Sequence, residues 1–219
     1  MAQHPDHQAA NQPHDNLLPQ TPEAQKNLDA PHMSTHAGGE SSDSTRSEST
    51  REHRAQAPQS VRCFVITVSD SRTEKDDRGG ALIKQLLGEA DHQTIGYRLV
   101  HDEAKLIADA VIEARDGISD PEAIIVTGGS GIGARDVSPE ALRPLLTKEM
   151  PGFGEVFRVL SWHEVGPATM LSRAFAGVIG RTLLFVLPGS PNAVRLAMEK
   201  LIVPELGHLV REIRPERRE

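Results

Sequence analysis

From about Val61 onward, the chain alternates between short apolar runs that are typical of strands and longer runs that carry apolar residues at helical spacing. The strand-like runs cover residues 63–69, 94–100, 123–127 and 182–187. The helix-like runs cover residues 80–90, 103–114, 140–146, 154–160, 168–175, 190–200 and 202–211. Strands separated by helices pair in parallel through crossover connections, and both faces of such a sheet are covered. The pattern therefore predicts a three-layer α/β/α domain with a mostly parallel sheet.

The first part of the chain has a different composition. Residues 1–58 are dominated by His, Gln, Ser, Pro, Asp and Ala, and Leu17, Leu18 and Leu28 are almost the only large aliphatic residues. Such a segment cannot offset its ordering entropy by burial, so we expect a disordered tail followed by one domain over residues 59–219. We find no secretory signal and no apolar run near the roughly 20 residues that cross a bilayer, so we expect no membrane partner.

Charge and cysteine content restrict the function classes. The formal net charge is −7, and the absence of a basic stripe argues against nucleic-acid binding. Cys63 is the single cysteine, which rules out an intramolecular disulfide and favours the cytoplasm; its place in a strand indicates an inert hydrophobic role. Most of the ten histidines are scattered through the tail without ligand-like spacing, so no zinc site is expected.

Each expected strand ends in a loop rich in Ser, Asp, Gly or Pro. The four loops begin at Ser69, His101, Gly128 and Pro188. Each one alone is compatible with ordinary turn and capping chemistry. In parallel sheets, however, ligands bind beyond the carboxyl ends of the strands, where these loops would meet. Four such loops at one edge favour a ligand site.

The third loop is the most informative. A β-branched run, 124–127, breaks into four glycines within six residues before Ser138 begins a helix. Glycines let backbone N–H groups approach an anion, and a helix start adds unpaired donors, so the segment predicts a phosphate site. Neither the dinucleotide spacing G-x-G-x-x-G nor a P-loop occurs, and nucleophile elbows are absent. Glycine loops with hydroxyls and a few carboxylates suit phosphoryl or nucleotidyl transfer with magnesium.

Four blocks of sequence carry a family resemblance. They are Thr127-Gly-Gly-Ser-Gly-Ile-Gly-Ala-Arg-Asp-Val-Ser-Pro-Glu-Ala141, Pro151-Gly-Phe-Gly-Glu155, Leu171-Ser-Arg-Ala174 and Leu187-Pro-Gly-Ser190. In this order and spacing they resemble the MoaB/MogA family of molybdenum cofactor biosynthesis proteins, from about Val61 to Ile213. The Pro-Gly-Ser-Pro loop and the segment 154–158 are more similar to the MoaB branch.

The resemblance implies a molybdopterin-binding fold, a homotrimer or a hexamer made from trimers, and adenylylation of molybdopterin with Mg-ATP. It places the catalytic carboxylates on Asp102 and Asp136, which we expect to hold Mg²⁺ against the triphosphate. Some members of the MoaB branch lack this activity. The alternative is therefore a non-catalytic pterin-binding or scaffold protein that works with other proteins of the pathway. A nucleotide-directed enzyme of the related competence-damage type is a third possibility, although its additional segments are absent.

The resemblance also suggests roles for further residues. Backbone donors for phosphates would come from Gly128, Gly129, Ser130 and Gly131, while the hydroxyls of Thr127 and Ser138 would bind ligand or cap. The remaining pocket residues would be Ser69, Asp70, Asp77, Gly79, Ser172, Arg173, Pro188, Gly189 and Ser190. Arg173 is a candidate phosphate ligand, with a structural ion pair as the alternative.

Overall fold

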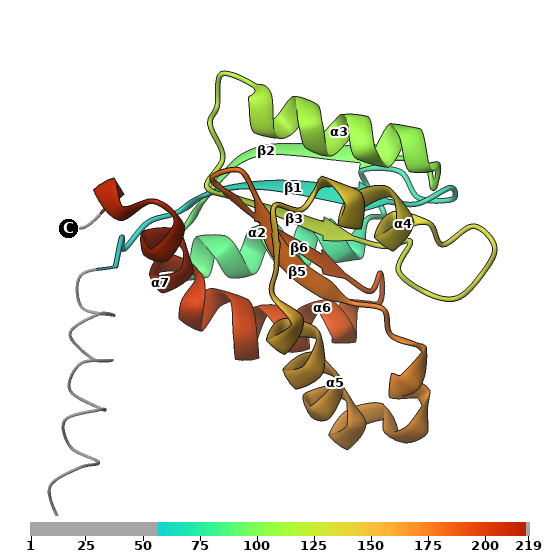
Figure 1. Cartoon of the computed structure of the whole chain (residues 1–219). Helices are drawn as coiled ribbons and strands as arrows, with labels where there is room; N and C mark the ends of the chain where they lie inside the picture. Colours follow the sequence, from blue (N-terminus) through green and yellow to red (C-terminus); the bar gives the residue numbers. More distant parts are fainter. Residues whose placement is uncertain (1–56, 218–219) are drawn as a thin grey trace, which may run out of the picture. The chain divides into compact units, whose positions relative to one another are not determined.

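A computed structural model describes residues 57–217, which form a six-stranded sheet with helices on both faces (Figure 1). The strands are β1 (Arg62–Val68), β2 (Gln93–Val100), β3 (Ala123–Thr127), β4 (Lys148–Glu149), β5 (Phe175–Ile179) and β6 (Thr182–Leu187). Their order in the sheet is β2-β1-β3-β6-β5-β4. The first four in this order are parallel, whereas β5 and β4 are antiparallel to their neighbours. The predicted mostly parallel sheet is confirmed.

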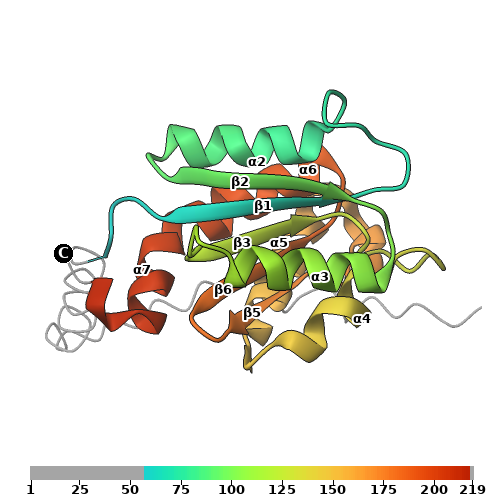
Figure 2. The same ribbon diagram turned by 90° about the horizontal axis from the view of Figure 1, so that it is seen from above.

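The helices occupy two layers. They are α2 (Arg78–Glu89), α3 (Ala104–Asp116), α4 (Ser138–Leu142), α5 (Pro151–Val165), α6 (Pro191–Ala197) and α7 (Val203–Ile213), with a π-helical segment, η3 (Met198–Ile202), between the last two. Figure 2 shows α2 and α6 on one side of the sheet and α3 and α4 on the other. Successive side chains of a strand point to opposite faces, so Ile125 packs in the core beneath α2 while Ile124 packs beneath α3. The three-layer prediction is confirmed.

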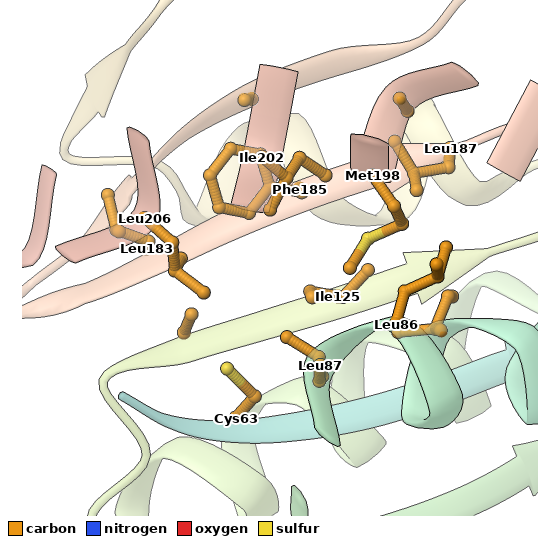
Figure 3. Packing of buried hydrophobic residues seen from close by; sticks show 14 of the residues in the cluster. Cys63, Leu86, Leu87, Ile125, Leu183, Phe185, Leu187, Met198, Ile202 and Leu206 are labelled. Atoms are coloured by element: carbon orange, nitrogen blue, oxygen red, sulfur yellow. The ribbon is translucent and has the colours of Figure 1, made fainter. Parts of the chain in front are cut away.

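The larger core lies between the sheet and the layer of α2, α6 and α7. Figure 3 shows Cys63 in this core with Leu87 of α2, and Phe185 of β6 with Met198 and Ile202 of η3. Cys63 is fully buried, and burial raises the pKa of its thiol far above the usual range. A buried thiol of raised pKa is a poor nucleophile, which supports the inert role expected from the sequence.

The segment before β6 differs from the expectation. A helix was expected over residues 168–175. The chain instead forms a short 3₁₀ helix, η2 (Gly166–Leu171), followed by β5, which lies next to the edge strand β4. β5 pairs with β6 through a tight turn in which Gly180 adopts φ +63°. Gly177 in β5 also faces the backbone of β4, where a Cβ atom would lie 2.5 Å from the Lys148 carbonyl oxygen. Pairing with β6 and β4 therefore overrides the local helical pattern.

The predicted tail, residues 1–58, lies outside the described residues except for its last two. Of these, Pro58 is buried, and its carbonyl oxygen would lie 2.5 Å from a Cβ atom at Gly207 of α7. Pro58, the residue just before the predicted start of the domain at 59, is thus already packed against α7. Within residues 57–217, no helix is both long enough and apolar enough to cross a membrane.

Candidate functional site

A cavity of about 910 Å³ opens at the carboxyl ends of the parallel strands. Residues from all four strand-end loops line it, which confirms that these loops meet at one edge of the sheet. From the predicted set, the cavity is lined by Ser69, Asp70, Asp102, Gly128, Gly129, Ser130, Gly131, Asp136, Ser172, Pro188, Gly189 and Ser190. The volume lies at the upper end of the range for small-molecule sites.

The glycine loop needs glycine for two separate reasons. Gly128 has φ +105°, and a Cβ atom there would lie 2.1 Å from the Val68 carbonyl oxygen. Gly129 has φ +62°, and a Cβ atom would lie 2.7 Å from Asp102 Oδ1. Both conformations are costly for other residues, and both positions also lack room for a side chain. The loop can therefore lie directly against β1 and the Asp102 carboxylate, with its backbone facing the cavity.

Two buried hydroxyls fix the loop from behind. Ser138 Oγ donates to the Gly128 carbonyl oxygen at 2.9 Å, and the Ser138 amide donates to the Gly129 carbonyl oxygen at 2.9 Å. Thr127 Oγ1 donates to the Pro188 carbonyl oxygen at 3.0 Å, which ties the end of β3 to the loop after β6. Neither hydroxyl lines the cavity. Of the two roles considered for Thr127 and Ser138, the geometry supports the structural one.

Arg173 braces the same loop from its outer side. Its Nε donates to the Gly131 carbonyl oxygen at 2.7 Å, and its Nη2 donates to the Asp136 carbonyl oxygen at 2.8 Å. Its Nη1 pairs with Glu140 of α4. The guanidinium is thus committed to protein groups and does not line the cavity. Arg173 therefore forms a structural ion pair, which was the alternative to the role of phosphate ligand suggested by the resemblance.

Asp102 and Asp136 line the cavity on either side of the glycine loop. Asp136 Oδ2 accepts a hydrogen bond from the Gly133 amide at 2.8 Å, whereas Asp102 Oδ1 accepts a weak one from the Val137 amide at 3.4 Å. Burial, followed by the negative charges of Asp136 and Asp70, raises the pKa of Asp102 above its ordinary value. Like charges crowded in this way favour binding of a proton or another cation.

Asp70 is held by the neighbouring loops. Its carboxylate accepts two hydrogen bonds from the Arg135 guanidinium, each at 3.0 Å, and one from the Asp102 amide at 3.0 Å. The amide of Asp102, and next the Arg135 guanidinium, lower the pKa of Asp70. Asp70 therefore links the loops after β1, β2 and β3 at the rim of the cavity.

Asp77 and Gly79 lie behind the cavity wall. Asp77 is the N-cap of α2, where its Oδ1 accepts from the Gly80 amide at 3.0 Å. Its Oδ2 accepts from Thr67 Oγ1 at 2.6 Å and from the Tyr97 hydroxyl at 2.8 Å. Burial opposes the charged form, but these hydrogen bonds outweigh it and lower the pKa of Asp77. Both residues are buried and neither lines the cavity, so the predicted pocket role is replaced by a structural one.

The cavity is also lined by residues to which the sequence analysis assigned no site role. Arg72 lines it from the loop after β1, Arg78 from the first residue of α2, and Asn192 from the start of α6. Phe157, Ser161 and Glu164 of α5 line it from the side. These three lie on one helical face, at i, i+4 and i+7, so their periodicity was visible in the sequence. The approach of α5 to this edge was not visible, because it depends on β4 and β5.

Comparisons with known proteins agree with this geometry. The family described as "Probable molybdopterin binding domain" matches residues 64–208. Molybdenum cofactor biosynthesis protein B of Bacillus subtilis is 49% identical over 172 residues, which cover 77% of this chain and 99% of that protein. The chain belongs to the MoaB family. The cavity-lining glycine loop lies within the matched residues 64–208.

Solved structures give the same relationship for this MoaB-family protein. A crystal structure of a molybdenum cofactor biosynthesis protein B is 48% identical, with a TM-score of 0.70 and coverage of 73% of this chain and 99% of the other. The tungsten cofactor synthesizing protein MoaB from Pyrococcus furiosus is 40% identical, with a TM-score of 0.65 and coverage of 72% and 99%. A MogA structure is 29% identical, with a TM-score of 0.62 and coverage of 69% and 99%. The resemblance to the MoaB/MogA family is therefore confirmed.

Proposed function

We propose that this MoaB-family chain adenylates molybdopterin with Mg-ATP in the cavity at the sheet edge. In this reaction an oxygen of the terminal phosphate of molybdopterin attacks the α-phosphorus of ATP. A new P–O bond forms as the bond to the bridging oxygen breaks, and pyrophosphate leaves with the electron pair. The product is an adenylated pterin, a phosphoanhydride. The assignment rests on family membership and on the residues that converge at the cavity.

The pair Asp102 and Asp136 is the observation that carries the proposal. Within residues 57–217, no group of three or more His, Cys, Asp or Glu side chains is placed to hold a metal ion by itself. Two carboxylates together with substrate phosphates are a usual ligand set for Mg²⁺. The raised pKa of Asp102 reflects a crowded negative site that a divalent cation would relieve. The donor set therefore fits Mg²⁺, which would neutralise charge on the triphosphate when bound.

The other residues would position the substrates. Backbone groups of the glycine loop face the cavity, where N–H groups can donate to phosphate oxygens. Arg173 holds the Gly131 and Asp136 carbonyl oxygens, so it fixes the loop and the second carboxylate relative to each other. Because phosphoryl-group transfer depends mostly on positioning and electrostatics, a rigid loop of this kind suits the reaction.

We further propose that the chain assembles as a homotrimer, or as a hexamer made from two trimers, through α5 and η2. Trp162 of α5 and Met170 of η2 are 56% and 80% exposed, and Val159, Val165 and Leu171 are exposed beside them in sequence. Contiguous exposed apolar side chains are typical of protein interfaces. Light scattering of the wild type and of Trp162→Glu tests this assembly: the wild type should be oligomeric and the variant smaller.

We place the protein in the cytoplasm. The support is its single cysteine, Cys63, which is reduced and buried in the core. A core built around a free thiol suits a reducing compartment. Fractionation of cells that produce the tagged chain would test the location.

Pyrophosphate release separates an enzyme from a binding protein. The purified chain would be mixed with Mg-ATP, with and without molybdopterin, and pyrophosphate would be measured. We expect release that depends on both the pterin and the magnesium. Tight pterin binding without release would instead favour a scaffold that hands molybdopterin to other proteins of the pathway.

A further inference from the structure

Two walls of the cavity carry opposite charge. Asp102 and Asp136 line the glycine-loop side, whereas Arg72 lines the opposite side from the loop after β1 and Arg78 from the start of α2. The first loop also contributes Asp70, but its carboxylate is paired with Arg135. A phosphate that arrives with its own magnesium ion can approach carboxylates. A phosphate without a metal is repelled by carboxylates and needs a protein cation. The two walls therefore suit two different phosphate groups.

The arginines around this cavity differ in how fully they are engaged. Arg135 donates two hydrogen bonds to Asp70. Arg173 donates to two carbonyl oxygens and pairs with Glu140. Neither arginine lines the cavity. Arg72 lines it and is about one-third exposed. Within the described residues, its guanidinium makes one hydrogen bond, from Nη2 to the Gly189 carbonyl oxygen at 3.2 Å. Most of its five N–H donors thus remain available for a ligand.

Among the described residues, Arg72 forms one ion pair, a long one with Asp77. Asp77 Oδ1 lies 3.8 Å from Arg72 Nη1, which is beyond hydrogen-bond distance. That carboxylate already accepts hydrogen bonds from Gly80, Thr67 and Tyr97. Its role toward Arg72 is to keep the guanidinium in place at long range.

The position of Arg72 is also fixed by its backbone. The Arg72 amide donates to Ser69 Oγ at 3.3 Å, which closes the turn after β1. On the other side, Nη2 of Arg72 donates to the Gly189 carbonyl oxygen in the loop after β6. Arg72 is therefore held between the loops after β1 and β6. A planar guanidinium held at a cavity wall can bind two phosphate oxygens at once.

We propose that Arg72 binds the terminal phosphomonoester of the acceptor substrate and thereby decides which phosphate occupies which wall. The acceptor phosphate, which carries no metal, lies on the Arg72 side, and the triphosphate with Mg²⁺ lies on the side of Asp102 and Asp136. This assignment rests on the proposed function, because it takes molybdopterin as the acceptor and Mg-ATP as the donor. Arg72 is a specificity-determining residue in this account.

Calorimetric titration of wild type, Arg72→Gln and Arg72→Lys tests the assignment. The ligands are molybdopterin, its dephosphorylated form, Mg-ATP and inorganic phosphate. We expect Arg72→Gln to weaken molybdopterin binding by about 10- to 100-fold, the usual range for a lost charged hydrogen bond. The affinity for inorganic phosphate should fall by a similar factor. The affinities for dephosphorylated molybdopterin and for Mg-ATP should change by less than about threefold. Arg72→Lys keeps the positive charge but loses the planar guanidinium that can bind two oxygens, so its affinity for molybdopterin should be intermediate.

Lys75→Gln is the matched control, since it removes one positive charge from the same loop at an exposed position that does not line the cavity. It should leave all four affinities unchanged. Thermal unfolding of each variant checks that the fold is kept. Equal weakening of phosphorylated and dephosphorylated pterin, or a larger loss for Mg-ATP, would overturn the assignment. Wild type that binds molybdopterin without releasing pyrophosphate would refute only the proposed enzyme activity; wild type that does not bind it would refute both.

Discussion

Asp77 and Asp102 both belong to loops that follow parallel strands at the same edge of the sheet, but their surroundings are opposite. Asp77 is buried and accepts hydrogen bonds from Gly80, Thr67 and Tyr97, and its pKa is lowered. Asp102 accepts a long hydrogen bond from Val137, lies near two other carboxylates, and has a raised pKa. Asp77 is thus surrounded by hydrogen-bond donors, whereas Asp102 has few. The difference separates a structural carboxylate from one that is prepared for a ligand.

The largest expected effect on stability comes from Asp77→Ala. It would remove the N-cap of α2 and leave the buried Thr67 hydroxyl without its carboxylate partner. We expect a loss of about 2–4 kcal/mol in the free energy of unfolding. Urea denaturation would measure it. Asp76→Ala is the control, because Asp76 is exposed and its contacts are confined to the local turn with Thr73; a loss of similar size there would show that burial of Asp77 is not the cause.

Asp102→Asn should act in the opposite direction. The substitution removes a negative charge from a site crowded by Asp136 and Asp70, so the free energy of unfolding should stay unchanged or rise by about 0.5–1 kcal/mol. Pyrophosphate release should nevertheless fall steeply. Denaturation and activity would be measured on the same preparation. A clear loss of stability would mean that Asp102 is structural, as Asp77 is.

The two carboxylates also predict opposite pH dependences. The pKa of Asp77 is lower in the folded state, so its contribution to stability is present above about pH 4 and is lost as the pH falls further. The pKa of Asp102 is raised, so its cost is present above that raised pKa and is relieved as the pH falls toward about 4. Accordingly, the gain from Asp102→Asn should be seen at neutral pH and vanish near pH 4. Urea titrations between these pH values would show whether the two signs differ.

A smaller effect is expected at the brace of the glycine loop. Arg173→Ala removes the hydrogen bonds to the carbonyl oxygens of Gly131 and Asp136, and we expect a loss of about 1–2 kcal/mol together with lower activity. Glu140→Gln removes only the exposed ion pair and should cost less than about 1 kcal/mol. If Glu140→Gln cost as much as Arg173→Ala, the ion pair and not the loop contacts would be decisive. Denaturation of both variants measures the difference.

The architecture could be read from the sequence because it follows from local patterns. The apolar runs around Val65, Tyr97, Ile125 and Phe185 place four strands, and the helical runs between them require parallel pairing. The meeting of the strand-end loops follows from that topology. β5 was missed because Ala176 and Gly177 give a weak strand pattern, and its pairing depends on β6 and β4. The local sequence does not contain that information.

The roles within the site could be predicted only in part. Asp102, Asp136 and the glycine loop do line the cavity, as expected. Asp77 and Arg173 resemble site residues in sequence, but their partners come from other segments, and those partners turn them into structural groups. Arg72 lies in the first strand-end loop, which was predicted to line the site, but it was assigned no role of its own, because its placement depends on the loop after β6. The sequence shows which residue type stands in which loop, but it does not show which hydrogen-bond donors surround that residue.

Asp136→Asn tests the central claim most directly, that the carboxylate wall makes this chain an adenylylating enzyme. Molybdopterin binding and pyrophosphate release would be measured on the same sample of wild type and variant in Mg-ATP. We predict that the variant still binds molybdopterin but releases pyrophosphate slower by on the order of 100-fold or more, because electrostatic stabilisation of the transferred phosphate is lost. Full retained turnover of the variant would contradict the account.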